Sequence, residues 1–151
     1  DASGAAARFN FPNQICLDSS GANMYVGEYG NHTIRKIVLS TGVVTTLAGT
    51  AGSSGSTDGT GAAARFNHPL GVCLDSSGNL YVSDYGNHTI RKIVISTGVV
   101  TTIAGTAGQS GSTDGTGTAA RFNEPNNIIF KSNILYVTDG SNHTIRKITL
   151  A

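Results

Sequence analysis

Histidines at a regular interval are the first residues in this sequence that could do chemistry. His32, His88 and His143 occupy the same place in three near-identical turns, and three imidazoles could hold one zinc ion. Zinc requires each nitrogen within about 2 Å of the metal, whereas equivalent turns of neighbouring sheets lie about 10 Å apart. We therefore expect no shared metal site, and we predict that each imidazole hydrogen-bonds within its own hairpin. His68 falls in a long loop and is predicted to be a surface residue.

The two cysteines occupy equivalent positions in the first two repeats. The third repeat has Ile129 where the others have Cys16 and Cys73, so the position is predicted to be an apolar core site. Packed sheets are about 10 Å apart, which exceeds the Cα separation of about 7 Å that a disulfide can span. We expect two reduced, structural thiols.

An acidic residue opens each long loop before a repeat. Asp58 and Asp114 begin the run Asp-Gly-Thr-Gly, and Asp1 holds the same place with a poorer match. A short helical turn over the alanines that follow, with an Asp or Thr side chain capping its N-terminus, is the predicted structure. Arg65 and Arg121 could then reach a backbone carbonyl or an Asp. A calcium loop would need more acidic oxygens at alternating positions, so we expect neither a metal nor a cofactor.

Basic residues recur as Arg-Lys pairs, at 35–36, 91–92 and 146–147. Neighbouring residues of a strand face opposite sides of a sheet, so these side chains are predicted to cover apolar neighbours with their stems. The net charge of +1 leaves no basic block of the kind that nucleic acid or a membrane surface attracts, and no apolar run is long enough to span a membrane. Nucleic-acid and membrane partners are not expected.

Catalysis would need different acidic, basic and nucleophilic groups gathered in one place, and near-identical repeats do not supply that asymmetry. Only the third repeat diverges on its first strand, with Asn126, Asn127 and Lys131. None of them adjoins an evident nucleophile or base. We therefore predict that the chain is not an enzyme.

The elements that must position these residues form a repeat of about 56 residues. Arg-Phe-Asn begins at Arg8, Arg65 and Arg121, which is a step of 57 and then 56 residues. The middle repeat predicts strands over 70–75, 80–84, 89–95 and 99–104, followed by a Gly/Ser/Thr-rich loop over 105–117. Four short strands repeated at this period are typical of a β-propeller blade. The predicted fold class is all-β.

The run from Asp75 to Ile93 resembles the NHL repeat, with Thr in place of the Leu of Asn-His-Leu. The resemblance implies a propeller with blades at about 11–50, 68–107 and 124–151 within a single domain, 1–151. The loop over 56–67 is similar to inter-blade loops of bacterial NHL proteins, many of them predicted to be secreted or surface-attached, so we expect a bacterial secreted or cell-surface parent protein. The first nine residues match the interior of a repeat, which indicates a segment of a longer protein or a designed chain.

Counting strands predicts assembly. The third repeat stops after its third strand, so its outermost strand is missing and the chain supplies eleven strands. Propellers have four to eight blades, and an open arc of three would leave apolar faces exposed. Two copies would give six blades, the number that the resemblance implies, whereas three copies would give nine. We expect a homodimer that closes a six-bladed ring.

The function predicted from these observations is a non-catalytic scaffold that assembles with itself and presents loops to a protein or small ligand. A propeller hydrolase or lyase with a channel-centred site, and an RNA-binding NHL domain, are the alternatives that the resemblance leaves open. The loops and turns that should share one binding face carry the residues Arg8, Asn10, Tyr29, His32, Arg65, Asn67, Tyr85, His88, Arg121, Asn123 and His143.

Overall fold

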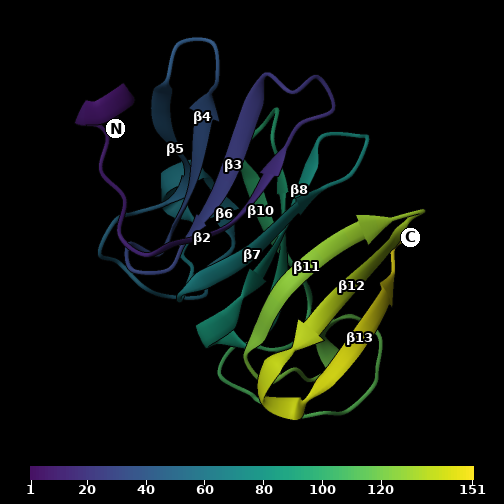
Figure 1. Cartoon of the computed structure of the whole chain (residues 1–151). Helices are drawn as coiled ribbons and strands as arrows, with labels where there is room; N and C mark the ends of the chain where they lie inside the picture. Colours follow the sequence, from purple (N-terminus) through teal and green to yellow (C-terminus); the bar gives the residue numbers. More distant parts are fainter.

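The computed structural model describes all 151 residues as three antiparallel sheets that follow one another along the chain (Figure 1). Sheet 1 contains β1 (Ala2–Ser3), β2 (Pro12–Leu17), β3 (Asn23–Glu28), β4 (Thr33–Val38) and β5 (Val43–Gly49). Sheet 2 contains β6 (Gly59–Thr60), β7 (Pro69–Leu74), β8 (Asn79–Asp84), β9 (Thr89–Val94) and β10 (Val99–Ala104). Sheet 3 contains only β11 (Pro125–Lys131), β12 (Ile134–Asp139) and β13 (Thr144–Thr149). The all-β prediction is confirmed.

The strand order shows that each long loop does more than connect two sheets. Sheet 1 has the order β1-β5-β4-β3-β2 and sheet 2 the order β6-β10-β9-β8-β7. The segments before β2 and β7 therefore run along the outer edges of the sheets that follow them. The expectation that residues 1–9 are loop is wrong at Ala2–Ser3, which pair with Val43 and Val44. The eleven predicted strands are present, and β1 and β6 add two short edge strands.

Short 3-10 helices complete the connections. Three lie directly before the first strand of a sheet, and two form the turn after the second strand: η1 (Gly4–Ala6), η2 (Gly61–Ala63), η4 (Gly117–Ala119), η3 (Tyr85–Asn87) and η5 (Gly140–Asn142). No helix of this structure is long and apolar enough to cross a membrane.

The core consists of two apolar layers, one between each pair of neighbouring sheets. Phe66 and Val72 of sheet 2 are fully buried against Ile34 of sheet 1, and Phe122 with Ile128 occupies the corresponding place on sheet 3. Each sheet is packed on both faces only where it has a neighbour on both sides, which is why sheet 2 contains most of the buried residues.

The cysteines lie where the sequence predicts. Cys73 is buried between sheets 2 and 3, Cys16 packs against the layer between sheets 1 and 2, and both are free thiols. Burial raises the pKa of the Cys16 thiol to about 12 and raises the pKa of Cys73 as well. Both side chains are therefore uncharged core residues at neutral pH.

The first strands β2, β7 and β11 lie beside one another, with β7 between the other two (Figure 1). Gln14 of β2 spans this middle strand. Its amide donates to the Ile128 carbonyl at 3.0 Å and accepts from the Ile128 N–H at 3.2 Å. Gly71 makes the crossing possible, because a Cβ there would lie 3.0 Å from the Gln14 oxygen and closer still to the Asn126 carbonyl.

Candidate binding face and the ion pairs beneath it

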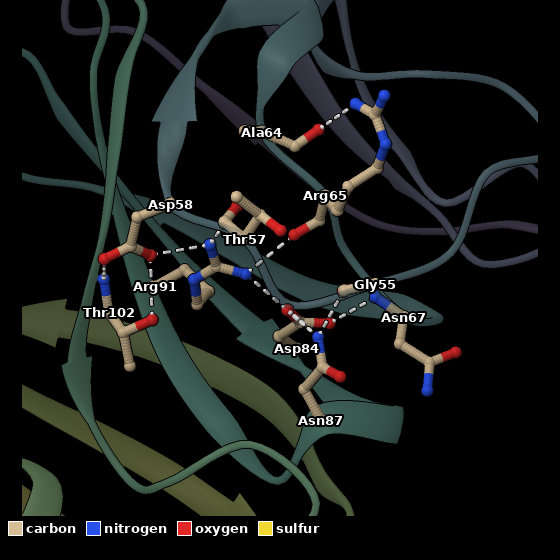
Figure 2. A network of polar contacts seen from close by, with 10 residues as sticks. All are labelled: Gly55, Thr57, Asp58, Ala64, Arg65, Asn67, Asp84, Asn87, Arg91 and Thr102. Carbon is tan, nitrogen blue, oxygen red and sulfur yellow. Dashed lines mark hydrogen bonds and ion pairs between the residues drawn. The ribbon is translucent and has the colours of Figure 1, made fainter.

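A buried arginine organises the loop side of each sheet. Arg91 of β9 is fully buried, and its Nη1 donates to Asp84 at 2.8 Å and to the Arg65 carbonyl at 2.9 Å (Figure 2). Its Nη2 donates to Asp58 at 2.8 Å and to the Thr57 carbonyl at 3.2 Å. The guanidinium also lies 5.1 Å from the centre of the Phe66 ring. One side chain thus joins the second strand, the third strand and the preceding loop.

The same arrangement recurs in the other two sheets. Arg35 pairs with Glu28 and Asp1, and Arg146 pairs with Asp139 and Asp114. The prediction that these arginines cover apolar neighbours is met by their contacts with Phe9 and Phe122. It missed the ion pairs, in which one acidic partner lies seven residues before the arginine and the other lies 32 to 34 residues before it. These guanidinium groups hold the loop and the strands together.

Asp84 is the buried carboxylate at the centre of the network in sheet 2. Burial raises its pKa to about 6, while the Arg91 charge opposes that rise. The carboxylate also accepts the Asn67 N–H at 2.8 Å and the Asn87 side-chain amide at 2.8 Å. Asn87 donates in addition to the Gly55 carbonyl at 2.7 Å, so the Asn of the Asn-His pair fastens the turn to the loop (Figure 2).

The loop aspartates have a different role from the predicted one. Neither the Thr60 nor the Thr116 end of the 3-10 helices has a side-chain cap, so the capping prediction is wrong. Asp58 instead accepts from the Thr102 N–H at 3.1 Å and the Thr102 hydroxyl at 2.9 Å, on the outermost long strand. Arg65 reaches backbone carbonyls as predicted, at 2.6 Å for Ala62 and 2.8 Å for Ala64.

The turn histidines connect neighbouring sheets. His32 and His88 adopt left-handed backbone conformations with φ of 60° and 59°. Nδ1 of His32 accepts the backbone N–H of His68 at 3.1 Å, and Nδ1 of His88 accepts that of Glu124 at 3.1 Å. The prediction of a bond within the same hairpin is wrong, because the side chain projects towards the next sheet. His143 has no following sheet in this chain and is exposed.

Four aromatic side chains gather above this junction, and we call Tyr29, His32, His68 and Tyr85 the aromatic cluster. Tyr29 stacks on His68 with 4.2 Å between ring centres, and it lies 6.0 Å from Tyr85. The His32 ring meets His68 edge-on at 4.6 Å. His68 is therefore half-buried in the cluster and is not the isolated surface residue that was predicted. The sequence places His68 directly before Pro69, the first residue of β7, and β7 is the strand that packs against sheet 1. That position could have indicated its burial.

Two groups of the cluster, His32 and Tyr85, have shifted pKa values. Burial, with a smaller contribution from the charge on His68, lowers the pKa of His32. Burial raises the pKa of Tyr85, and a hydrogen bond with Glu124 raises it further. Half-buried rings with hydroxyl and imidazole groups at their edges are suited to planar or apolar ligand groups that also carry hydrogen-bonding atoms.

Apart from the exposed His143, the predicted binding residues divide into two groups. Tyr29, His32, Tyr85 and His88 lie together on one face, along the junctions between sheets. The arginines and asparagines of the Arg-Phe-Asn runs serve the loops instead: the arginines hold 3-10 turns, and the asparagines bind the buried carboxylates by their N–H groups, in residues Arg8, Asn10, Arg65, Asn67, Arg121 and Asn123. No three His, Cys, Asp or Glu side chains come together in an arrangement that could hold a metal ion.

Comparison with known proteins agrees with this geometry. The NHL repeat model matches residues 66–93. NHL repeat-containing protein 2 of Bos taurus is 36% identical over 95% of this chain and 21% of its own length, and the chloroplastic protein SUPPRESSOR OF QUENCHING 1 of Arabidopsis thaliana is 35% identical over 94% and 14%. The chain therefore spans about a fifth or less of these relatives.

Solved structures resemble the chain over most of its length. A Bacteroides thetaiotaomicron protein of unknown function matches with a TM-score of 0.83 and 28% identity, over 90% of this chain and 34% of that one. An auxiliary nutrient binding protein of the same organism matches with a TM-score of 0.78 and 26% identity, over 88% and 36%. Virginiamycin B lyase of Staphylococcus aureus, at 17% identity and a TM-score of 0.59 over 98% and 44%, shares the fold alone.

Proposed function

From the premise that this chain is built of NHL-type repeats, we propose that it is a non-catalytic propeller scaffold of three blades, two copies of which close into a six-bladed ring. The ring presents the aromatic cluster and its equivalents to a protein or small ligand. The observation that carries the proposal is the pair of apolar faces left open at the two ends of the chain.

The open face of sheet 3 supports this assembly. Ile145 of β13 is 70% exposed, whereas Ile34 and Ile90 at the equivalent positions of sheets 1 and 2 are 0% exposed. Ile129, which takes the place of the two cysteines, is exposed too. In the first two sheets these positions are covered by the next sheet along the chain. In sheet 3 they lack that cover.

The open face of sheet 1 has the complementary residues. Ile15 is 54% exposed, whereas Val72 and Ile128 at the equivalent positions are 0% exposed. Phe9 is exposed as well, although Phe66 in the same place is fully buried. Sheet 1 of a second copy would therefore cover sheet 3 with the same contacts that join consecutive sheets within one chain.

The side chains at the closing junction are also compatible with a second copy. Within the chain, His68 packs on Tyr29, and Glu124 bonds Tyr85. The residue equivalent to these tyrosines in sheet 3 is Gly140, and the residue equivalent to His68 in sheet 1 is the larger Phe11, which is 75% exposed. A large side chain thus faces the position with no side chain, so the two can approach without a clash.

Stoichiometry favours two copies. Three sheets from each of two chains give six blades, within the range of four to eight, and one two-fold axis along the channel forms both junctions at once. His143 would then accept the backbone N–H of Phe11 of the second copy, as His32 and His88 do within the chain.

The chemistry of the polar side chains supports a scaffold in preference to a hydrolase or lyase. Each buried carboxylate already pairs with an arginine, and burial raises the pKa of both thiols. The aromatic cluster offers half-buried rings to a ligand, and one similar structure is described as an auxiliary nutrient binding protein. The net charge of +1 favours a neutral ligand over RNA.

Light scattering after size exclusion tests the assembly. We expect a mass near twice 15.5 kDa for the natural chain and near 15.5 kDa for the Ile145→Glu variant, because a buried, unpaired carboxylate would oppose the junction. Val99→Glu is the matched control, since Val99 is exposed on sheet 2, away from both open faces, and this variant should remain dimeric. A natural chain that is monomeric at every concentration would refute the ring.

A further inference from the structure

The outer edge of sheet 3 differs from those of the other two sheets. In sheets 1 and 2 a fourth long strand, β5 or β10, lies between the third strand and the short edge strand. In sheet 3 no strand lies beyond β13. The space between β13 and the loop at Gly115–Thr116 is a groove of about 780 Å³.

We infer that this groove binds an extended peptide strand from another chain, with the sequence that β5 and β10 share: Val-Val-Thr-Thr, then Leu or Ile, then Ala-Gly. The groove is present in the single chain, with or without the six-bladed ring. The equivalent places in sheets 1 and 2 are occupied by β5 and β10, which show what the groove in sheet 3 accepts.

The backbone of β13 offers the pairing surface. β13 pairs with β12 on one side only, so the hydrogen-bonding groups of its other edge are free to add a strand. The register follows from sheet 2, where Val99 and Val100 lie opposite Val94 and Ile93. The bound peptide would place its two valines opposite Thr149 and Ile148, in the antiparallel sense.

The floor of the groove supplies an apolar anchor point. In sheet 2 the side chain of Val100 is 1% exposed and belongs to the same apolar cluster as Ile93 and Phe66. The equivalent residues of sheet 3, Ile148 and Phe122, both line the groove. The second valine of the peptide would occupy the place that Val100 has in sheet 2, which favours a β-branched apolar residue there.

Asp114 supplies the polar recognition. Its equivalent Asp58 accepts two hydrogen bonds from Thr102 of the fourth strand and is 49% exposed, whereas the Asp114 side chain is 94% exposed. One Asp114 oxygen already bonds Arg146 at 2.7 Å. The carboxylate is thus held beside the groove, ready to accept the N–H and hydroxyl of a peptide threonine through charge-assisted bonds.

The test uses the natural chain and a fluorescein-labelled peptide with the sequence of residues 96–106, followed by fluorescence anisotropy. We expect saturable binding, and none to a scrambled peptide of the same composition. Asp114→Ala should weaken binding at least about tenfold, because it removes charged acceptors. Asp58→Ala is the matched control and should leave the affinity unchanged, since its groove already holds β10.

A change in the peptide separates recognition from a general effect on folding. Thr102→Val in the peptide should cost at least about tenfold against the natural chain and little against Asp114→Ala, because both changes remove the same bonds. The inference is wrong if the peptide does not bind, if the scrambled peptide binds equally well, or if the losses from Asp114→Ala and the peptide change simply multiply.

Discussion

At the scale of single residues, the buried arginines are the centre of this molecule. Arg91 donates to four oxygens, which come from the second strand and from the loop before the sheet. A lysine has a single charged nitrogen and could not serve these separated acceptors. Burying the Arg91–Asp84 pair is costly by itself, so its main effect is to select one arrangement of loop and strands.

Replacing Arg91 by Met should lower the free energy of unfolding by about 3 to 5 kcal/mol, because the Asp84 carboxylate would remain buried without its partner. Urea unfolding followed by circular dichroism measures this difference. Arg146→Met also leaves a buried carboxylate, that of Asp139, without its partner, but it should cost somewhat less, because the Arg146 side chain is 12% exposed and water can reach the site. Equal losses in the two variants would contradict this account of burial.

At the scale of elements, the inter-sheet loops bind to the sheet that follows them through hydrogen bonds and ion pairs. Both loops leave the end of a fourth strand and turn through a 3-10 helix before the first strand of the next sheet, and the loop between sheets 1 and 2 also adds the edge strand β6. The exit from the fourth strand is tight. Gly105 has a φ of 85°, and a Cβ there would lie 2.5 Å from the His88 carbonyl oxygen.

Gly105→Ala should therefore lower the free energy of unfolding by about 2 to 4 kcal/mol, from left-handed strain and from the clash with backbone. Gly108→Ala is the matched variant, since Gly108 has a φ of 73° but open space around its Cα. It should cost only about 1 kcal/mol. Chemical denaturation of both variants tests the difference, and similar costs would show that crowding at the exit is unimportant.

At the scale of the whole molecule, consecutive sheets repeat one contact, and the chain ends before that contact has been made everywhere. The middle sheet is covered on both faces, whereas sheets 1 and 3 each have one face open. In the proposed ring, stability would depend on the second copy and hence on protein concentration.

We expect the thermal midpoint of the natural chain to rise with protein concentration, measured by calorimetry over a hundredfold dilution series. Association stabilises the folded state by mass action, so each dilution should lower the midpoint. The Ile145→Glu variant should unfold at a midpoint that is independent of concentration. A natural chain with a constant midpoint would contradict dimerisation as a source of stability.

The sequence by itself determined the features that depend on local pattern. The period of the repeat, the eleven long strands and the core position of Cys16 and Cys73 could all be predicted, because strand formation and burial follow from residue type and spacing. The gathering of Tyr29 and Tyr85 on one face could also be predicted, since equivalent turns of a repeat lie at the same end of successive sheets.

Only the tertiary structure decided which side chains meet. Asp58 bonds Arg91 and Thr102, His32 bonds His68, and Ala2 pairs with Val44, although 33 or more residues separate the members of each pair. The partner of a charged or hydrogen-bonding group depends on which segments the packing of sheets brings within about 3 Å. The local sequence pattern does not determine which segments those are. The groove beside β13 also depends on the tertiary structure, because it forms only when β13 and the loop at Gly115–Thr116 are brought together.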